Sequence, residues 1–294
     1  MYKRQVQYSR GCRFNCTFCS IRAFYGSNLR QRPVEQVAED IRRSGKRHFF
    51  IVDDNLFIDT EKSRQLFEAL LPLGITWSCQ VSVDVARDPG LVRLMARSGC
   101  ISALVGFESL EPESLRQVKK HWNVRWQSYD EAIAVFRNAG IMLYGTFVFG
   151  CDSDTVASFD TAVDFAIRHK FLLANFNPLT PMPGARLFDA MQAEGRLLHD
   201  RWWLDPTFRY GDATFEPKGM TADELTAGCF AARIRFNTWR SIGNRLFDRQ
   251  ANFRSPYRAA IYCAANLVSR REIYRKQARR LGAGTPLEAA AVRP

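Results

Sequence analysis

The chain has 294 residues, of which 46% are hydrophobic, and a formal net charge of +12 at pH 7. This length and composition suffice for a sizeable buried core, in one large domain or in one domain with an appendage. No segment approaches the run of about 18 apolar residues that a transmembrane helix needs, which excludes a membrane-spanning chain.

The cysteines and the N-terminal segment bear on the cellular compartment. The first residues, MYKRQVQYSRGC, contain no apolar stretch that could serve as a signal peptide. Eight cysteines without an export signal indicate a reducing compartment, where thiols serve metal or redox chemistry rather than disulfides. We therefore expect a cytoplasmic protein.

Six apolar or mixed runs alternate with helical patterns in the first part of the chain. The predicted strands are residues 4–8, 47–54, 75–84, 100–109, 141–150 and 171–181. The predicted helices between them are residues 34–45, 61–74, 89–99, 112–120, 129–140 and 155–170. This alternation predicts an α/β fold with a parallel sheet. Periodicity alone also allows an open doubly wound sheet, but we expect a six-unit (β/α)6 partial TIM barrel of parallel strands with a helical C-terminal extension.

The alternation stops after residue 183. Helical patterns follow at residues 184–198, 220–247 and 255–282, and an aromatic, irregular segment occupies residues 199–219. We predict three parts: a barrel at 1–183, a helical and aromatic region covering the barrel mouth at 184–282, and a disordered tail at 283–294.

Three cysteines lie close together in RGCRFNCTFCS, directly after the first predicted strand: Cys12, Cys16 and Cys19. Structural zinc sites and electron-carrying iron–sulfur clusters usually take four protein ligands, and no fourth Cys or His is near in the sequence. Three thiolates would leave one iron of a cubane cluster open, and an open coordination position is where a substrate or cosubstrate binds. The loop lies at the carboxyl end of a strand, where the chemistry of such folds collects.

This spacing, C-x3-C-x2-C with the aromatic Phe18 before the last cysteine, resembles the signature of the radical S-adenosylmethionine (SAM) superfamily. The resemblance implies that Cys12, Cys16 and Cys19 bind a [4Fe–4S] cluster whose fourth iron is chelated by SAM. It also implies cleavage of SAM to methionine and a 5′-deoxyadenosyl radical that abstracts hydrogen from a substrate. A reductant such as flavodoxin or ferredoxin would supply the electron.

Further positions match features of the superfamily and are expected to contact SAM. They are Phe18, Asp54, Asn55, Glu108, Ser109 and Gly145. The pair at the end of the second strand would hold the SAM amino group, and the pair at the end of the fourth strand would contact the ribose or methionine portion. The glycine and the phenylalanine would lie at the adenine. The alternative for the acids is ordinary strand-end capping and turn formation.

A narrower resemblance to the cobalamin-associated branch, including the hopanoid methylases, rests on segments such as VDDNLF, LVGFESLEPESLRQVKKHWN and GTFVFGCDSDT. It implies possible methyl transfer with cobalamin as a cofactor. Such proteins carry a cobalamin-binding domain before the cysteine loop, whereas this chain begins at the first strand. We therefore expect either a truncated or split member, with a separate cobalamin-binding protein as a possible partner, or direct use of the adenosyl radical.

The aromatic segment after the sixth strand favours an apolar or ring-bearing small-molecule substrate, because it contains Trp202, Trp203, Phe208 and Tyr210. The five remaining cysteines are expected to be buried and hydrophobe-like. They are Cys79, Cys100, Cys151, Cys229 and Cys263.

The basic, aromatic-rich stretch from Cys229 to Arg280 leaves alternatives open. It could bind an anionic membrane surface and make the protein peripheral at the membrane, or it could form amphipathic helices whose arginines stay in water. An RNA-modifying enzyme is a rival interpretation, although no RNA-binding module follows the sixth strand and nucleic acid is not an expected partner. A non-enzymatic iron–sulfur electron carrier is a second rival.

Overall fold

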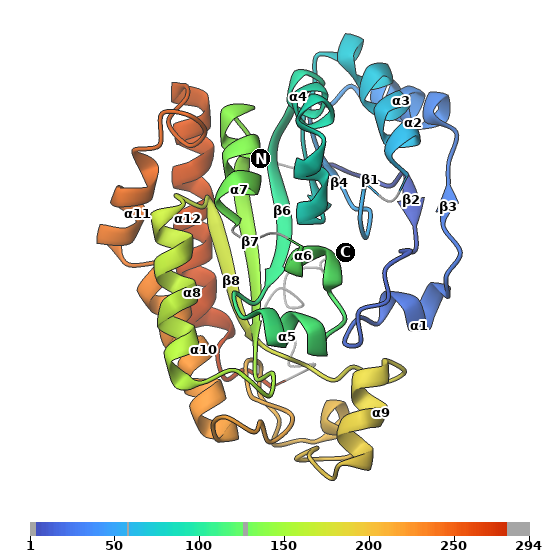
Figure 1. Cartoon of the computed structure of the whole chain (residues 1–294). Coiled ribbons are helices and arrows are strands. Elements are labelled where there is room, and N and C mark those ends of the chain that lie inside the picture. Colours follow the sequence, from blue (N-terminus) through green and yellow to red (C-terminus); the bar gives the residue numbers. More distant parts are fainter. Residues whose placement is uncertain (1–3, 58, 126–128, 281–294) are drawn as a thin grey trace, which may run out of the picture.

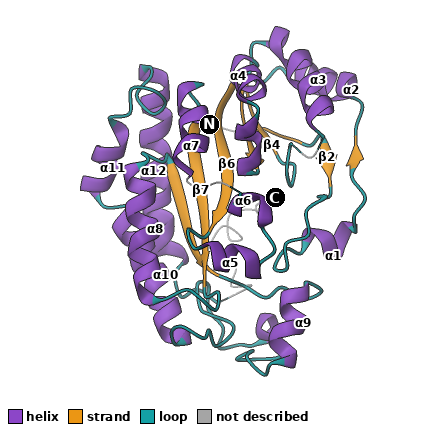
Figure 2. Ribbon diagram, viewed as in Figure 1, coloured by secondary structure: helices purple, strands orange, loops and turns teal. Residues whose placement is uncertain are grey.

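The computed structural model describes residues 4–57, 59–125 and 129–280. A six-stranded parallel sheet forms its centre (Figures 1 and 2). In order across the sheet, the strands are β1 (Arg4–Val6), β4 (His48–Ile51), β5 (Thr76–Val81), β6 (Cys100–Glu108), β7 (Met142–Phe149) and β8 (Leu173–Pro178). All neighbours pair in parallel and the spatial order follows the chain order, which confirms the predicted α/β fold and its six strands.

Helices connect successive strands and cover one face of the sheet. They are α2 (Val34–Arg43), α3 (Thr60–Leu70), α4 (Pro89–Arg97), α7 (Tyr129–Asn138) and α8 (Val156–Arg168). Short 3₁₀ helices extend the connections: η1 (Leu71–Leu73) and η2 (Val83–Arg87). Residues alternate along the strands, so that Phe147 and Phe149 of β7 are buried against the helices, whereas Tyr144 points to the less covered face.

Aromatic rings fill the core between β6, β7 and β8. The ring of Phe107 stacks on those of Phe147 and Phe171, with centroids 5.8 and 5.2 Å apart. Phe176 of β8 continues the stack from Phe147 at 5.5 Å. Such rings contribute large buried apolar areas, which accounts for the nearly continuous apolar strands of the sequence.

The sequence patterns did not reveal several small elements near the cysteine loop. β2 (Ser9–Arg10) and β3 (Arg30–Gln31) form a short antiparallel pair, and α1 (Ile21–Tyr25) lies between them in the chain. After β6 come α5 (Pro112–Gln117), which was predicted, and α6 (His121–Val124), which was not. Figure 1 shows α5 and α6 gathered at the carboxyl end of β6.

The chain after β8 is mainly helical, as predicted. Its helices are α9 (Arg186–Ala193), η3 (Trp202–Leu204), α10 (Ala222–Phe236), α11 (Trp239–Leu246) and α12 (Pro256–Lys276). Helices α10 and α12 lie along the β8 side of the sheet, while α2 and α3 lie at the opposite end (Figure 1). The division at residue 183 stays a prediction, and the predicted tail, 283–294, lies outside the described residues.

The prediction of a single helix over residues 220–247 is wrong in one respect, because the structure has two helices there, α10 and α11. The capping box that starts α10 is confirmed. The Thr221 hydroxyl accepts a hydrogen bond from the backbone N–H of Glu224, and the Glu224 carboxylate accepts a hydrogen bond from the backbone N–H of Thr221. The break comes at Asn237, whose side chain donates to the carbonyl of Arg233. Thr238 then caps α11 by accepting from the backbone of Ser241.

Within the described residues, no helix combines the length and the apolar character that would let it cross a bilayer.

Candidate active site at the carboxyl ends of the strands

Two adjacent carboxylates fix the entry of the cysteine loop. Asp53, buried just after β4, accepts hydrogen bonds from the backbone of Tyr8 at 2.8 Å and of Ser9 at 2.7 Å. Asp54 accepts from the backbone of Gly11 at 3.0 Å. Burial raises the pKa of Asp53 to about 6, and the hydrogen bonds from Ser9 oppose the rise. The two acids therefore join the second strand to the start of the loop.

Glycine is the only residue type that fits at position 11, directly before Cys12. Its φ is +95°, in the region that favours glycine, and a Cβ atom there would come within 2.5 Å of the Asn28 carbonyl oxygen. Asn28 precedes β3 in the chain, and Gly11 follows β2. Their close approach therefore places the segment that leads into β3 against the start of the cysteine loop.

The middle of the cysteine loop is held between the chain after β6 and the chain after β8. The backbone of Thr17 donates to the carbonyl of Val118 at 3.1 Å and accepts from the backbone of Leu187 at 2.9 Å. The ring of Phe14 stacks on that of Trp122 with centroids 3.7 Å apart. Segments far apart in sequence thus fix the loop at several points.

The three thiols of Cys12, Cys16 and Cys19 are free, half-buried and close enough to affect one another. Burial raises the pKa of each, and that of Cys16 to about 12. The Lys120 ammonium opposes this rise at all three thiols. The Lys120 ammonium thus favours the thiolate, which is the form that binds a metal.

Three thiols could bind a polynuclear cluster, in which each thiolate would bind a different iron. Among the described residues, no group of three His, Cys, Asp or Glu side chains is placed to hold one metal ion.

Glu108 and Lys120 form a buried ion pair beside the thiols. The Lys120 ammonium donates to the Glu108 carboxylate at 2.5 Å and to the Gly106 carbonyl at 2.8 Å. Glu108 has a φ of +64°, uncommon for a residue other than glycine, and the pairing of β6 with β7 shifts register between Gly106 and Glu108. A Cβ on Gly106 would lie 2.3 Å from the Glu108 carboxylate, so a larger residue would displace the pair from its present position. Such strain is typical of functional sites.

The structure brings together some of the predicted SAM-contacting residues. Asp54 and Glu108 lie close enough to the thiols for their charges to raise thiol pKa values: Asp54 acts on Cys12 and Cys19, and Glu108 on Cys16 and Cys19. These two acids and the three cysteines form one charged cluster, together with Lys120.

Three other predicted contacts have their side chains engaged elsewhere. Asn55 is buried and donates to the Ser82 hydroxyl at 2.9 Å, while the Ser109 hydroxyl accepts from the backbone of Glu111 in a local turn. Phe18 packs against the hydrophobic core. For these residues the turn-forming and packing roles are visible, and their contact with SAM stays a prediction.

Gly145 has a packing explanation. A Cβ atom at this position would lie 2.5 Å from the Phe171 ring, on the side of the sheet that faces the buried aromatic stack. The missing side chain thus makes room for Phe171, whereas the sequence interpretation had it make room for a flat ligand. An approach of its backbone to adenine stays a prediction.

The aromatic segment forms a small cluster of its own. Trp202 is buried, donates to the Pro181 carbonyl at 3.1 Å, and packs against Trp203 and Phe208. Of the four predicted aromatics, Tyr210 alone lines a cavity of about 690 Å³ beside β7 and β8. Of the five other cysteines, four are buried as predicted; Cys263 is exposed, because it lies on a solvent-facing turn of α12.

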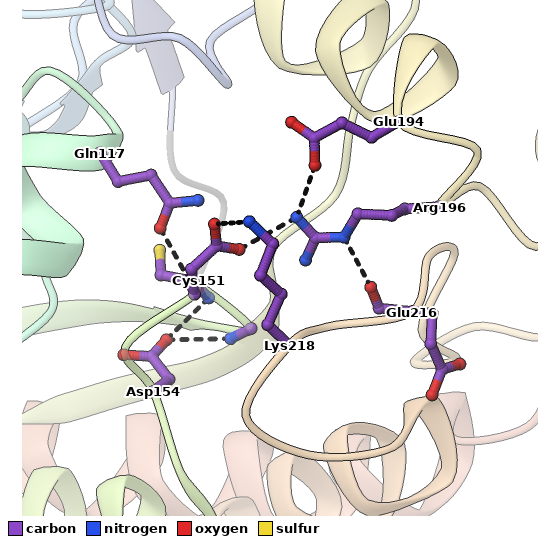
Figure 3. A network of polar contacts seen from close by, with 9 residues as sticks. Gln117, Cys151, Asp154, Glu194, Arg196, Glu216 and Lys218 are labelled. Carbon is purple, nitrogen blue, oxygen red and sulfur yellow. Dashed lines mark hydrogen bonds and ion pairs between the residues drawn. The ribbon is translucent and has the colours of Figure 1, made fainter.

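A polar network ties this segment to the carboxyl edge of the sheet (Figure 3). Asp152, in the loop after β7, accepts from Arg196 at 3.0 Å and from Lys218 at 2.7 Å, while its backbone donates to Gln117 of α5. The neighbouring Asp154 accepts from the backbones of Gly150 and Cys151, both at 2.9 Å. The network connects the loop after β7 to α5 and to both ends of residues 196–218.

Lys120 and Trp122 are the site residues that sequence reasoning missed. Both lie in QVKKHWN, which looks like the end of an exposed helix because two lysines adjoin a histidine. The available signal was a cation and an aromatic closely following the acidic end of β6, since buried acids are usually paired.

Comparisons with known proteins agree with this geometry. The profile of the Radical SAM superfamily matches residues 6–166, more than half of the chain. The chain is 32% identical to the bacteriochlorophyllide d C-12(1)-methyltransferase of Chlorobaculum tepidum, over 74% of this chain and 48% of the relative. It is 30% identical to the hopanoid C-2 methylase of Rhodopseudomonas palustris, over 66% of this chain and 39% of the relative.

The fold is also similar to a solved structure. The radical S-adenosylmethionine methyltransferase TsrM from Kitasatospora setae superposes with a TM-score of 0.60 at 15% identity, over 77% of this chain and 43% of that chain. The chain spans about half or less of the length of these relatives. The profile match, which includes the three cysteines and the strands that position them, shows that the chain belongs to the radical SAM superfamily.

Proposed function

We propose that this chain is the catalytic core of a radical SAM enzyme, with Cys12, Cys16 and Cys19 as ligands of a [4Fe–4S] cluster. The observation that carries the proposal is the convergence of three half-buried thiols with the Glu108–Lys120 pair at the carboxyl edge of a parallel sheet. The cluster, when bound, supplies the electron that cleaves SAM to methionine and a 5′-deoxyadenosyl radical.

The charged residues beside the thiols suit a zwitterionic amino acid group. Lys120 offers an ammonium for the SAM carboxylate, and Asp54 and Glu108 offer carboxylates for the SAM ammonium. Because the Lys120 ammonium already bonds to Glu108 and to a carbonyl, it is held in place before SAM binds. Phe14, Trp122 and the bonds of Thr17 keep the loop that carries the cysteines in one position.

We propose methyl transfer to an apolar or ring-bearing small molecule as the overall reaction. Both curated relatives described above are named as a methyltransferase or methylase, which supports this reaction class. The radical mechanism requires a reductant, for which flavodoxin or ferredoxin is suitable. A cobalamin-binding unit, in the same protein or in a partner, would carry the methyl group.

Electron paramagnetic resonance of the anaerobically reconstituted and reduced protein tests the site. We expect a [4Fe–4S] signal that changes on addition of SAM, because SAM would bind the open iron. A cluster signal that SAM leaves unchanged would contradict the proposed open site and would favour an electron carrier. Transfer of a labelled methyl group from SAM, with and without added cobalamin, then separates methyl transfer from other radical chemistry.

We propose peripheral association with an anionic membrane as an additional property. The supporting observation is a surface around α11 with two strongly exposed aromatics, Trp239 and Phe247, next to the exposed Arg240 and Arg249. Co-sedimentation with vesicles of phosphatidylglycerol, and of phosphatidylcholine as the neutral control, measures it. Equal recovery with both vesicles, or recovery with neither, would reject it.

A further inference from the structure

A cavity lies beside β7 and β8 and is lined by residues of α10 and α12. Its volume is about 690 Å³, which falls in the range of small-molecule sites. We propose that this cavity binds an apolar small molecule that carries a carboxylate, and that Arg233 receives the carboxylate. The inference names a substrate class and so rests on the proposed function.

The wall formed by α12 is apolar over much of its length. Ile261, Ala265, Val268 and Ile273 of α12 line the cavity together with Leu173 of β8, and the polar part of this wall consists of Ser269, Glu272 and Lys276. Such a wall suits a hydrocarbon chain or ring system, whose transfer from water is favourable by about 25 cal/mol per Å² of apolar surface.

Arg233 supplies a cation with unused donors. The residue is only 9% exposed, and its guanidinium donates to the Phe176 carbonyl, the Asn177 side chain and the Gln277 side chain. These contacts use one N–H on each nitrogen, so two of the five remain, one on each terminal nitrogen. The three acceptors are neutral, and no carboxylate of the described residues forms an ion pair with Arg233. A planar pair of N–H groups suits a carboxylate.

Arg245 provides an internal comparison, because it is a buried arginine without a ligand cavity. Its guanidinium donates to five acceptors, which match its five N–H groups: the Ser241 hydroxyl, the carbonyls of Phe171, Leu172 and Phe236, and the Asn266 side chain. Arg245 is thus a structural arginine with all donors used. Arg233 differs in lining a cavity and in keeping two donors.

A second polar group in the cavity wall is unsatisfied. The side-chain oxygen of Asn237, a residue 2% exposed, is buried without a hydrogen-bond partner, although its amide group donates to the Arg233 carbonyl. Buried acceptors are usually paired, so this oxygen indicates a donor on the bound molecule or a water. The other two charged residues of the wall, Glu272 and Lys276, form an ion pair, and Glu272 also bonds to Arg275.

Isothermal titration of the protein with decanoate, and with methyl decanoate as the uncharged analogue, tests the inference. We expect decanoate to bind at least about tenfold more tightly, since a hydrogen-bonded charge typically contributes more than 1.4 kcal/mol. Arg233→Gln should abolish this preference while leaving the ester affinity similar. Because Gln at position 233 also loses bonds to β8, its melting temperature is measured alongside.

Two further variants locate the binding. Val268→Trp fills the cavity from an exposed position on α12 and should weaken both probes. Leu267→Trp adds the same ring at an exposed position of the same helix that does not line the cavity, and it should change neither. Equal affinity of the wild type for the two probes, or unchanged decanoate binding by Val268→Trp, would overturn the inference. SAM cleavage by the wild type is measured separately: cleavage without a decanoate preference rejects this inference alone, and a preference without cleavage rejects the proposed function alone.

Discussion

The Lys120 ammonium lies 2.5 Å from the Glu108 carboxylate, and the two side chains are 7% and 11% exposed. This pair joins the strained end of β6 to the start of α6, next to all three thiols. A buried pair costs much desolvation and is a weak source of net stability, so its position beside the thiols is better explained by function.

Replacement of Lys120 by Met should therefore impair both the fold and the reaction. The change leaves the Glu108 carboxylate buried without its cation, which costs about 3–5 kcal/mol of unfolding free energy. Urea unfolding and SAM cleavage are the measurements. Lys119→Met, one residue away and exposed, is the matched control and should cost less than about 0.5 kcal/mol. Equal stability of the two variants would show that the pair does not matter.

The buried Asp53 should make stability depend on pH. Its pKa is raised from 3.8 to about 6, so between those values the folded state binds a proton that the unfolded state lacks. Stability contributed by this group is present at lower pH and is lost as pH rises through about 6. Between pH 5 and pH 7 we expect the unfolding free energy of the wild type to fall by about 1 kcal/mol relative to Asp53→Asn. A difference that is constant with pH, or that grows toward pH 7, would contradict the assignment.

The stacking of Phe14 on Trp122 should protect the cluster. Phe14→Ala removes a ring contact at 3.7 Å, worth about 1 kcal/mol, and frees the loop between Cys12 and Cys16. The reconstituted variant should lose its visible cluster absorbance several-fold faster in air. Phe24→Ala provides the control, because that ring on α1 is 78% exposed. Identical decay in both variants would exclude a role for the stack.

The network of Figure 3 should determine how firmly residues 196–218 are held. Although burial opposes the change, Lys218 and Arg196 lower the pKa of Asp152, so the carboxylate form is the bound form. Asp152→Asn should weaken both contacts by about 1 kcal/mol in total and speed proteolysis within this segment. Glu194→Gln, which removes the other and more exposed carboxylate on Arg196, should have a smaller effect. Unchanged cleavage in Asp152→Asn would mean that other contacts hold the segment.

The fold was largely predictable because its signals are local. Apolar runs such as IMLYGTFVFG and the capping box at Thr221 report buried strands and helix starts directly. The antiparallel pair of β2 and β3 was not predictable, because it has two residues on each side and depends on contacts with the cysteine loop. The break between α10 and α11 comes at Asn237, whose side chain bonds back to the Arg233 carbonyl, and no periodicity reveals it.

The sequence indicated the three cysteines by their spacing, and it also indicated Asp54 and Glu108, which lie near the thiols. It did not indicate Lys120, because the pairing of Lys120 with Glu108, twelve residues earlier, depends on how the turn after β6 folds back. Gly145 has a packing reason in the Phe171 ring, which the sequence does not show, and its contact with adenine stays a prediction. Tertiary contacts thus decide which residues of a motif face the reaction.

Formation of 5′-deoxyadenosine is the most direct test of the proposed function. The protein is reconstituted anaerobically with iron and sulfide, reduced with dithionite and incubated with SAM, and the product is measured by mass spectrometry. Cys16→Ala serves as the control, since it removes the most buried of the three proposed ligands. We predict product from the wild type and none from the variant. An intact cluster in the wild type that yields no 5′-deoxyadenosine would contradict a catalytic core and would favour an electron carrier.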